Sequence, residues 1–288
     1  MKNFELFLNL TRLNKPIGFM LLFWPCLWGL ALAYDFSSDN FIFFKHLILF
    51  FLGALLMRSA GCIVNDMLDR KIDKLVDRTK NRPIASGKIS VKSSLIIVII
   101  LCLLAFLILI QFNMKTIILG LVSMPFAFSY PLMKRYTYWP QLFLGFTFNY
   151  GLIMAWVSIT NEINYYPLIL YFGAIFWTLG YDTIYGFQDI KDDEIIGVKS
   201  TSIKFKKNPK TFISLCYLTF LMSILLIGKF MSFNIFYFVL SIIIIFHLMV
   251  YQLMNLNIKD ATSCLKKFRS NNFFGLLVFV TILLGKIF

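Results

Sequence analysis

The sequence predicts an all-α integral membrane protein whose nine transmembrane helices form a bundle. Hydrophobic residues make up 59% of the 288 residues, whereas soluble domains are roughly 45–50% apolar. These residues gather in nine long runs, and a spanning helix needs about 20 of them. No polar stretch is long enough to form a soluble domain. We therefore expect residues 1–288 to be one membrane-embedded domain.

The nine runs are separated by connections of two kinds. In chain order, the runs are 17–34, 41–63, 93–112, 115–132, 141–160, 165–187, 211–229, 232–254 and 272–288. Long polar loops cover 64–92, 133–140, 188–210 and 255–271. The short connections are 35–40, 113–114, 161–164 and 230–231.

The ends of several runs are marked by polar residues. The first run follows Arg12 and Lys15, and the fourth ends beside Tyr130 and Pro131. The second and sixth runs each end at an acidic cluster, and a long basic loop follows each cluster. This weak internal repeat predicts two four-helix units of the same polarity, with both clusters on one face of the bundle.

Positive charge predicts the orientation of the chain. The N-terminal stretch, the four long loops and Arg58 hold 24 of the 28 Lys and Arg residues. By the positive-inside rule, the N-terminus and these loops are cytoplasmic, and the ninth helix ends on the far side. This placement explains the net charge of +14 better than nucleic-acid binding does. The N-terminus lacks a signal-peptide cleavage site, and the compact length without a transit peptide predicts a bacterial inner membrane.

The first acidic cluster follows the second apolar run. Asn65, Asp69 and Asp73 are spaced i, i+4 and i+8, with Asp66 beside them. Residues at this spacing project from one face of a helix. Carboxylates at a membrane boundary are costly unless positive charge lies among them.

The second cluster has the same geometry. Asp182 and Asp189 are seven residues apart, and Asp189 and Asp193 are four apart. The two histidines lie elsewhere, and the five cysteines form no CxxC pair, so neither zinc nor disulfides are expected. Oxygen ligands alone suit Mg²⁺, which takes one or two carboxylates together with substrate phosphates.

A simpler interpretation is that the acids form solvated helix ends, paired with neighbouring bases. Those bases are Arg70, Lys71, Lys74 and Lys191. Two features count against it: the acids recur in two matched places, and nearly all of them are aspartates.

Basic and aromatic residues near the clusters are candidates for the substrate. Arg78, Lys80 and Arg82 alternate in the loop after the first cluster, where they could clamp a leaving diphosphate. Arg58 lies inside an apolar run and should face the bundle interior and meet an anion. Lys134 and Arg135 are either anchors of the membrane topology or further ligand-binding residues. Three aromatic residues near the second cluster are also candidates, namely Trp177, Tyr181 and Tyr185. The last three could line a pocket that stabilises a carbocation.

With these motifs the chain resembles the UbiA family of intramembrane prenyltransferases. The family signature NDxxDxxxD matches 65–73, and YDTxYxxxDxxDD matches 181–193. Supporting stretches at 12–18, 57–62, 77–83 and 130–135 extend the resemblance from residue 12 to about 205.

The resemblance implies a nine-helix bundle with a central cavity, a cytoplasmic cap and a lateral opening to lipid. It implies that Mg²⁺ and the diphosphate of a polyprenyl donor are held by Asn65, Asp66, Asp69, Asp73, Asp182, Asp189 and Asp193. Four of these aspartates would be catalytic, namely Asp69, Asp73, Asp189 and Asp193. The substrate-binding set would be Arg58, Arg78, Lys80, Arg82, Lys134, Arg135 and Tyr185, with Arg58 and Arg135 as candidates for the acceptor's carboxylate or the diphosphate.

Within the family, the chain is most similar to members that prenylate 4-hydroxybenzoate ortho to its hydroxyl in ubiquinone biosynthesis. Another aromatic acceptor, such as a naphthoate, homogentisate or haem, is the first alternative. The second is a cation-coupled transporter that uses the acidic clusters as ion sites. Transporters often place such sites near the membrane midplane, whereas both clusters here lie at the cytoplasmic boundary.

Overall fold

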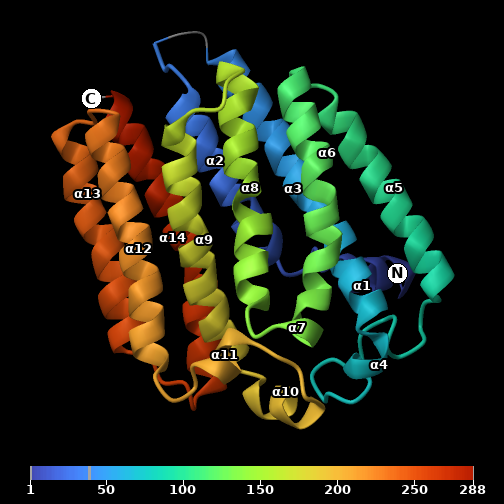
Figure 1. Ribbon diagram of the computed structural model, residues 1–288. Helices are drawn as coiled ribbons and strands as arrows, with labels where there is room; N and C mark the ends of the chain where they lie inside the picture. The colour runs from blue at the N-terminus through green and yellow to red at the C-terminus, as the bar shows by residue number, and fades with distance from the viewer. Residues whose placement is uncertain (1, 38–39, 288) are drawn as a thin grey trace.

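A computed structural model describes residues 2–37 and 40–287, which form helices joined by turns and loops, with no strand (Figure 1). The first half contains α1 (Lys2–Thr11), α2 (Ile17–Ala33), α3 (Phe41–Leu68), α4 (Arg70–Asp73), α5 (Val91–Leu109), α6 (Met114–Ser129), η1 (Tyr130–Leu132) and α7 (Met133–Tyr136). The second contains α8 (Pro140–Thr160), α9 (Tyr165–Gly186), α10 (Ile190–Ile196), α11 (Thr201–Lys204), α12 (Pro209–Phe230), α13 (Ile235–Ile245), the π-helix η2 (Phe246–Met254) and α14 (Ala261–Ile287).

The expected all-α membrane architecture is confirmed in its main features. In the described part of the chain, 8 helical segments are long and apolar enough to cross a bilayer. The first predicted span is also helical, but α2 has only 17 residues, or about 25 Å at 1.5 Å per residue. The long helices run side by side as a bundle (Figure 1).

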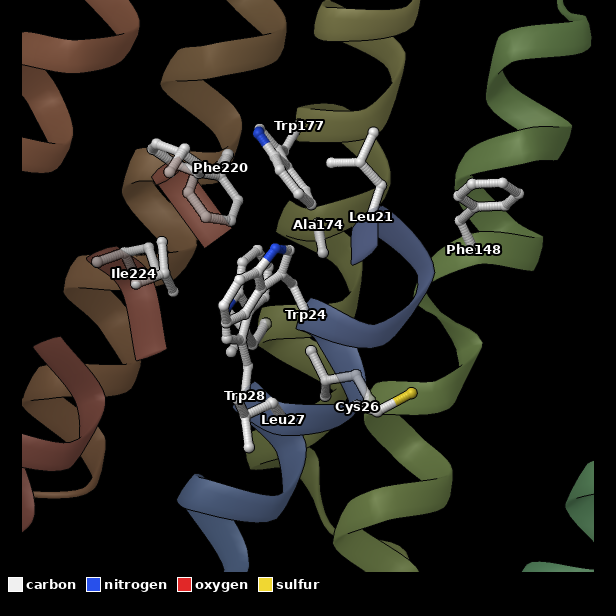
Figure 2. Packing of buried hydrophobic residues seen from close by; sticks show 14 of the residues in the cluster. Leu21, Trp24, Cys26, Leu27, Trp28, Phe148, Ala174, Trp177, Phe220 and Ile224 are labelled. Atoms are coloured by element: carbon white, nitrogen blue, oxygen red, sulfur yellow. The ribbon is translucent and has the colours of Figure 1, made fainter. Parts of the chain in front are cut away.

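Protein surrounds α2 on most of its length, which accounts for a sequence that is apolar on all sides. It packs against α3, α8, α9 and α14. The Trp28 ring is fully buried, with its centroid 5.0 Å from that of Trp177 and 6.1 Å from that of Phe220 (Figure 2). At Gly29 the backbones come so close that an added Cβ would lie 2.2 Å from the carbonyl oxygen of Leu152 on α8.

The last long helix begins earlier than the sequence predicts. The prediction of a loop over 255–271 is wrong from Ala261 onward, because α14 starts there. The Asp260 carboxylate accepts hydrogen bonds from the backbone N–H groups of Thr262 and Ser263, at 2.9 and 3.2 Å, and so satisfies free donors of the first turn. Polar residues in the next turns of α14 face the protein, since Lys267 and Asn271 are both buried.

The short helices gather at one end of the bundle, where α4, α7, α10 and α11 lie together (Figure 1). Hydroxyl groups attach the α11 segment to the neighbouring helices. Thr201 Oγ1 is 2.6 Å from Thr183 Oγ1 on α9, and the Thr201 N–H donates to Gln141 Oε1 on α8 at 3.0 Å. Ser202 Oγ donates to the Thr183 carbonyl at 2.8 Å. These bonds return the chain to the bundle after α10 and so fix the position of the second acidic cluster.

Candidate active site

The first acidic cluster keeps the predicted helical stripe although α3 ends within it. Asn65 and Asp66 lie in the last turn of α3, Asp69 follows its end, and Asp73 closes α4. Backbone hydrogen bonds from Asp69 N to Asn65 O (2.9 Å) and from Asp73 N to Asp69 O (2.8 Å) carry the helical path onward. The three aspartates are 1–5% exposed, so the stripe faces the protein interior.

Basic side chains from three other segments neutralise this cluster. Arg82 Nη1 lies 3.1 Å from Asp66 Oδ1 and 2.9 Å from Asp73 Oδ2. Lys134 pairs with Asp69 Oδ2, and Arg12 pairs with Asp66 Oδ1. The N-terminal segment, the loop after α4 and α7 are therefore all tied to the end of α3.

The second cluster is bound to the same basic loop. Arg78 Nη2 lies 2.5 Å from Asp189 Oδ2, and Arg78 Nη1 donates to the Tyr185 hydroxyl at 2.9 Å. Asp189 immediately precedes α10, and Asp193 lies in its first turn. The loop that carries Arg78 and Arg82 thus contacts both clusters.

A polar cavity of about 670 Å³ brings the two clusters together. Its wall includes the predicted site residues Arg58, Asn65, Asp69, Asp73, Arg78, Arg82, Lys134, Asp182, Tyr185, Asp189 and Asp193. Asp66 lies behind this wall, fully covered. The cavity therefore has the acidic and basic groups that a metal-bound polyanion requires.

A second, apolar cavity of about 180 Å³ adjoins the first, and the two share Arg58, Tyr130 and Phe148. Side chains of α2, α3, α5, α6 and α8 line it. At the end farthest along α3 from Arg58 stand Phe50 and Phe112, whose ring centroids are 4.7 Å apart. A polar headgroup and an apolar chain can therefore occupy adjoining spaces, with Arg58 at the junction.

Burial raises the pKa of three carboxyl groups in the polar cavity. The pKa of Asp193 rises to about 6 through burial and the nearby charge of Asp189. Burial also raises the pKa values of Asp73 and Asp189, although Arg82 and Arg78 oppose the change. Burial thus disfavours the charged form of each carboxyl group, and a bound cation would oppose this effect.

The donor groups fit a hard divalent cation by their chemistry. Asp66 Oδ2 and Asp69 Oδ1 are buried carboxylate oxygens without a hydrogen-bond partner, which is costly unless a cation or water reaches them. No three acidic, histidine or cysteine side chains in the described part of the chain converge closely enough to hold a metal by themselves. Phosphate oxygens of a ligand would have to complete the coordination, as is usual for Mg²⁺.

Besides Asp66, three predicted residues do not line the cavity. Lys80 pairs with exposed Asp77 at 2.6 Å. Arg135 is exposed and donates to the Leu68 carbonyl at 2.7 Å, with its guanidinium 3.7 Å from Asp69. Trp177 is buried in the core, and its indole donates to Asn271, whereas Tyr181 and Tyr185 do line the cavity.

Arg12 is a site residue that the sequence analysis missed. Its charge was assigned to membrane orientation, yet its guanidinium reaches Asp66. Its backbone has φ of 57°, in the left-handed region that a non-glycine residue seldom adopts. Strain of this kind concentrates at functional sites. The one feature of the sequence that pointed to a functional role for Arg12 was its place in the 12–18 stretch, which supports the resemblance to the UbiA family.

Fold and site together define an all-α membrane protein with a cavity lined by acidic and basic side chains at one end of its helices. Residues 22–278 match the UbiA prenyltransferase family, and the chain belongs to that family.

Relatives match nearly the whole chain. The mitochondrial 4-hydroxybenzoate polyprenyltransferase of Rattus norvegicus is 42% identical over 98% of this chain and 75% of its own length. The 4-hydroxybenzoate octaprenyltransferase of Psychromonas ingrahamii is 39% identical over 98% and 96%.

Among solved structures, a UbiA homolog from Aeropyrum pernix K1 has a TM-score of 0.73 at 21% identity, covering 94% of this chain and 96% of that one. A UbiA homolog from Archaeoglobus fulgidus bound to GPP and Mg²⁺ has a TM-score of 0.69 at 18% identity, covering 96% and 99%. Both share the fold.

Proposed function

We propose that this protein transfers a polyprenyl group from polyprenyl diphosphate to the ring carbon ortho to the hydroxyl of 4-hydroxybenzoate, releasing diphosphate, in ubiquinone biosynthesis. The observation that carries the proposal is the adjoining pair of cavities. One is polar and lined by both aspartate clusters, and the other is apolar and suited to an isoprenoid chain. The names of relatives about 40% identical over nearly the whole chain support the acceptor.

The residues that would hold Mg²⁺ and the donor diphosphate are Asn65, Asp66, Asp69, Asp73, Asp189 and Asp193. Asp182, grouped with them from the sequence, lies within α9, about one turn before that helix ends at Gly186. When bound, Mg²⁺ would withdraw charge from the leaving diphosphate. Arg78, Arg82 and Lys134 already face the same space and would pair with phosphate oxygens.

Arg58 is the better candidate for the acceptor's carboxylate, and Arg135 is not placed for it. The Arg58 guanidinium lies between the two cavities, 5.2 Å from the Phe148 ring centroid. Its Nε is buried without a hydrogen-bond partner. A carboxylate held there would present its aromatic ring at the junction, where the allylic carbon of a donor would arrive.

The apolar walls would also keep water from the reacting carbon. An allylic cation formed when the C–O bond breaks would be quenched by water, so a dry space is required. Tyr130 and Phe148 border both cavities and offer ring faces at this point.

Gly53 is expected to leave room for the prenyl chain. It lines the apolar cavity, and a Cβ added there would meet nothing within 4 Å. Gly53→Phe should lower transfer from a long polyprenyl diphosphate by roughly 10- to 100-fold, the cost of overpacking a filled space. Transfer from geranyl diphosphate should fall much less. Leu52→Phe, on the exposed side of α3, is the matched control, and an equal loss with both donors would contradict this role.

The orientation follows from charge, since the clusters and the basic loops lie at one end of the bundle. We infer that this end is cytoplasmic, that the membrane is a bacterial inner membrane, and that the chain is one domain built from two four-helix units with nine spans. The acidic clusters after α3 and α9 support the repeat.

A transfer assay tests the function. Membranes carrying the chain are given radiolabelled 4-hydroxybenzoate and a long polyprenyl diphosphate, with Mg²⁺ or EDTA. We expect label in an organic-extractable product, with diphosphate release, only when Mg²⁺ is present. Transfer to a naphthoate or homogentisate instead would establish another acceptor. No diphosphate release with any acceptor would overturn the enzyme in favour of the transporter.

A further inference from the structure

Two oppositely charged side chains face the polar cavity without pairing. Arg58 on α3 and Asp182 on α9 both line it. The positive charge of Arg58 attracts the Asp182 carboxylate electrostatically. Neither residue forms an ion pair within 4 Å anywhere in the described ranges 2–37 and 40–287. Every other aspartate lining this cavity, apart from Asp193, is paired with a base.

The two residues precede the acidic clusters by the same number of residues, since Arg58 precedes Asn65 by seven and Asp182 precedes Asp189 by seven. Seven residues of helix span about 10 Å on α3, whereas α9 ends at Gly186, after Asp182 and before Asp189. Asp182 is therefore set apart from Asp189 and from the bases Arg78 and Arg82, which pair with carboxylates at the rim.

Local packing holds Arg58 in place, so that it does not simply collapse onto Asp182. Phe148 lies under its guanidinium at 5.2 Å, and the Tyr130 hydroxyl interacts with it. Gly18 provides the space, because a Cβ there would lie 3.0 Å from Arg58 Nε. Arg58 and Asp182 are both partly covered by protein, and a charge held away from water without an ion-pair partner is costly. The space beside them is therefore suited to a ligand with an acidic group at one end and a hydrogen-bond donor at the other.

We propose that Asp182 is a catalytic residue for the acceptor and not a ligand of the metal: its carboxylate accepts a hydrogen bond from the phenolic hydroxyl of 4-hydroxybenzoate while Arg58 binds the carboxylate at the opposite end of the ring. The inference rests on the proposed function and assigns the acceptor's orientation within it. Tyr181, 1% exposed, lines the same wall with a hydroxyl that has no hydrogen-bond partner, and it offers a second polar contact.

The arrangement gives Asp182 a defined part in the reaction. The allylic C–O bond breaks and its electron pair leaves with the diphosphate. The ring carbon ortho to the hydroxyl supplies the pair for the new C–C bond. Positive charge then develops on the phenolic oxygen, and the hydrogen bond to Asp182 stabilises it. The released diphosphate takes the proton from the attacked carbon, which restores the aromatic ring, and Asp182 ends the step as a carboxylate.

The test compares two ligands and two variants in the purified full-length chain. Wild type should bind 4-hydroxybenzoate more tightly than benzoate, by roughly 10- to 100-fold for a hydrogen bond to a charged acceptor. In Asp182→Asn the amide oxygen is a neutral and weaker acceptor, so this preference should fall to roughly 10-fold or less. Manganese binding in the presence of geranyl diphosphate, followed by electron paramagnetic resonance, should be unchanged in Asp182→Asn and lost in Asp69→Asn.

Each outcome has a definite meaning. Loss of manganese binding in Asp182→Asn, to the level of Asp69→Asn, would make Asp182 a metal ligand and overturn the inference. An undiminished preference for 4-hydroxybenzoate in Asp182→Asn would do the same. A wild-type measurement needs no variant to fold: 4-methoxybenzoate cannot donate a hydrogen bond and should bind as weakly as benzoate. If wild type binds manganese and geranyl diphosphate but no hydroxybenzoate, the proposed acceptor itself is wrong.

Discussion

Asp69→Asn is expected to reduce prenyl transfer by roughly 100- to 1000-fold or more, the loss typical when a group that stabilises transition-state charge is removed. Asp69 is 1% exposed, lies on the wall of the polar cavity, and has one carboxylate oxygen without a hydrogen-bond partner. The amide keeps the size of the side chain but loses its charge, so it cannot attract a divalent cation. Initial rates with saturating donor and acceptor measure the effect.

Asp77→Asn is the matched control for that experiment. It changes the same group eight residues away, in a side chain that is 92% exposed and pairs with Lys80 outside the cavity. Its rate should equal that of wild type. Size-exclusion profiles in detergent should be alike for all three proteins. Wild-type turnover in folded Asp69→Asn would remove this aspartate from the metal-binding set.

Arg82→Gln is expected to lower kcat/KM for the donor by roughly 100-fold, because a charge-assisted contact with the diphosphate is lost, buried Asp73 loses its partner and buried Asp66 keeps only Arg12. The Arg82 guanidinium bridges Asp66 and Asp73 and lines the cavity. The KM for 4-hydroxybenzoate should change far less, because Arg82 lies at the rim, away from Arg58.

Lys80→Gln is the matched control for Arg82→Gln, because Lys80 lies in the same basic loop but outside the cavity. Its side chain is 53% exposed and points to Asp77, so the donor kinetics should stay at the wild-type level. Equal losses in Arg82→Gln and Lys80→Gln would mean that the loop acts through its overall charge and not through the contacts described.

The long helices and the acidic stripe could be predicted from the sequence, because both depend on local periodicity. Asn65, Asp69 and Asp73 keep their spacing through the break between α3 and α4, since the backbone bonds continue there. The start of α14 could not be predicted in the same way. Its first turns bury Lys267 and Asn271, and charged or amide residues in a row are more typical of a loop.

Ion pairs between segments far apart in the chain also could not be predicted from sequence patterns. Arg12 and Asp66 are 54 residues apart, and the charge of Arg12 had a sufficient explanation in membrane orientation. Lys80 alternates with Arg78 and Arg82, but this stretch consists of turns, so equal spacing does not place the three side chains on one face. Only the fold shows that Lys80 points away.

The ion pairs at the rim also bear on how the reaction ends. Arg78, Arg82 and Lys134 each pair with an aspartate. On our proposal each exchanges that aspartate for a phosphate oxygen and returns to it afterwards. The carboxylates thus compete with product for the same cations, and diphosphate can depart without leaving three bare positive charges at a membrane boundary. The protein supplies its own counter-ions for the second half of its catalytic cycle.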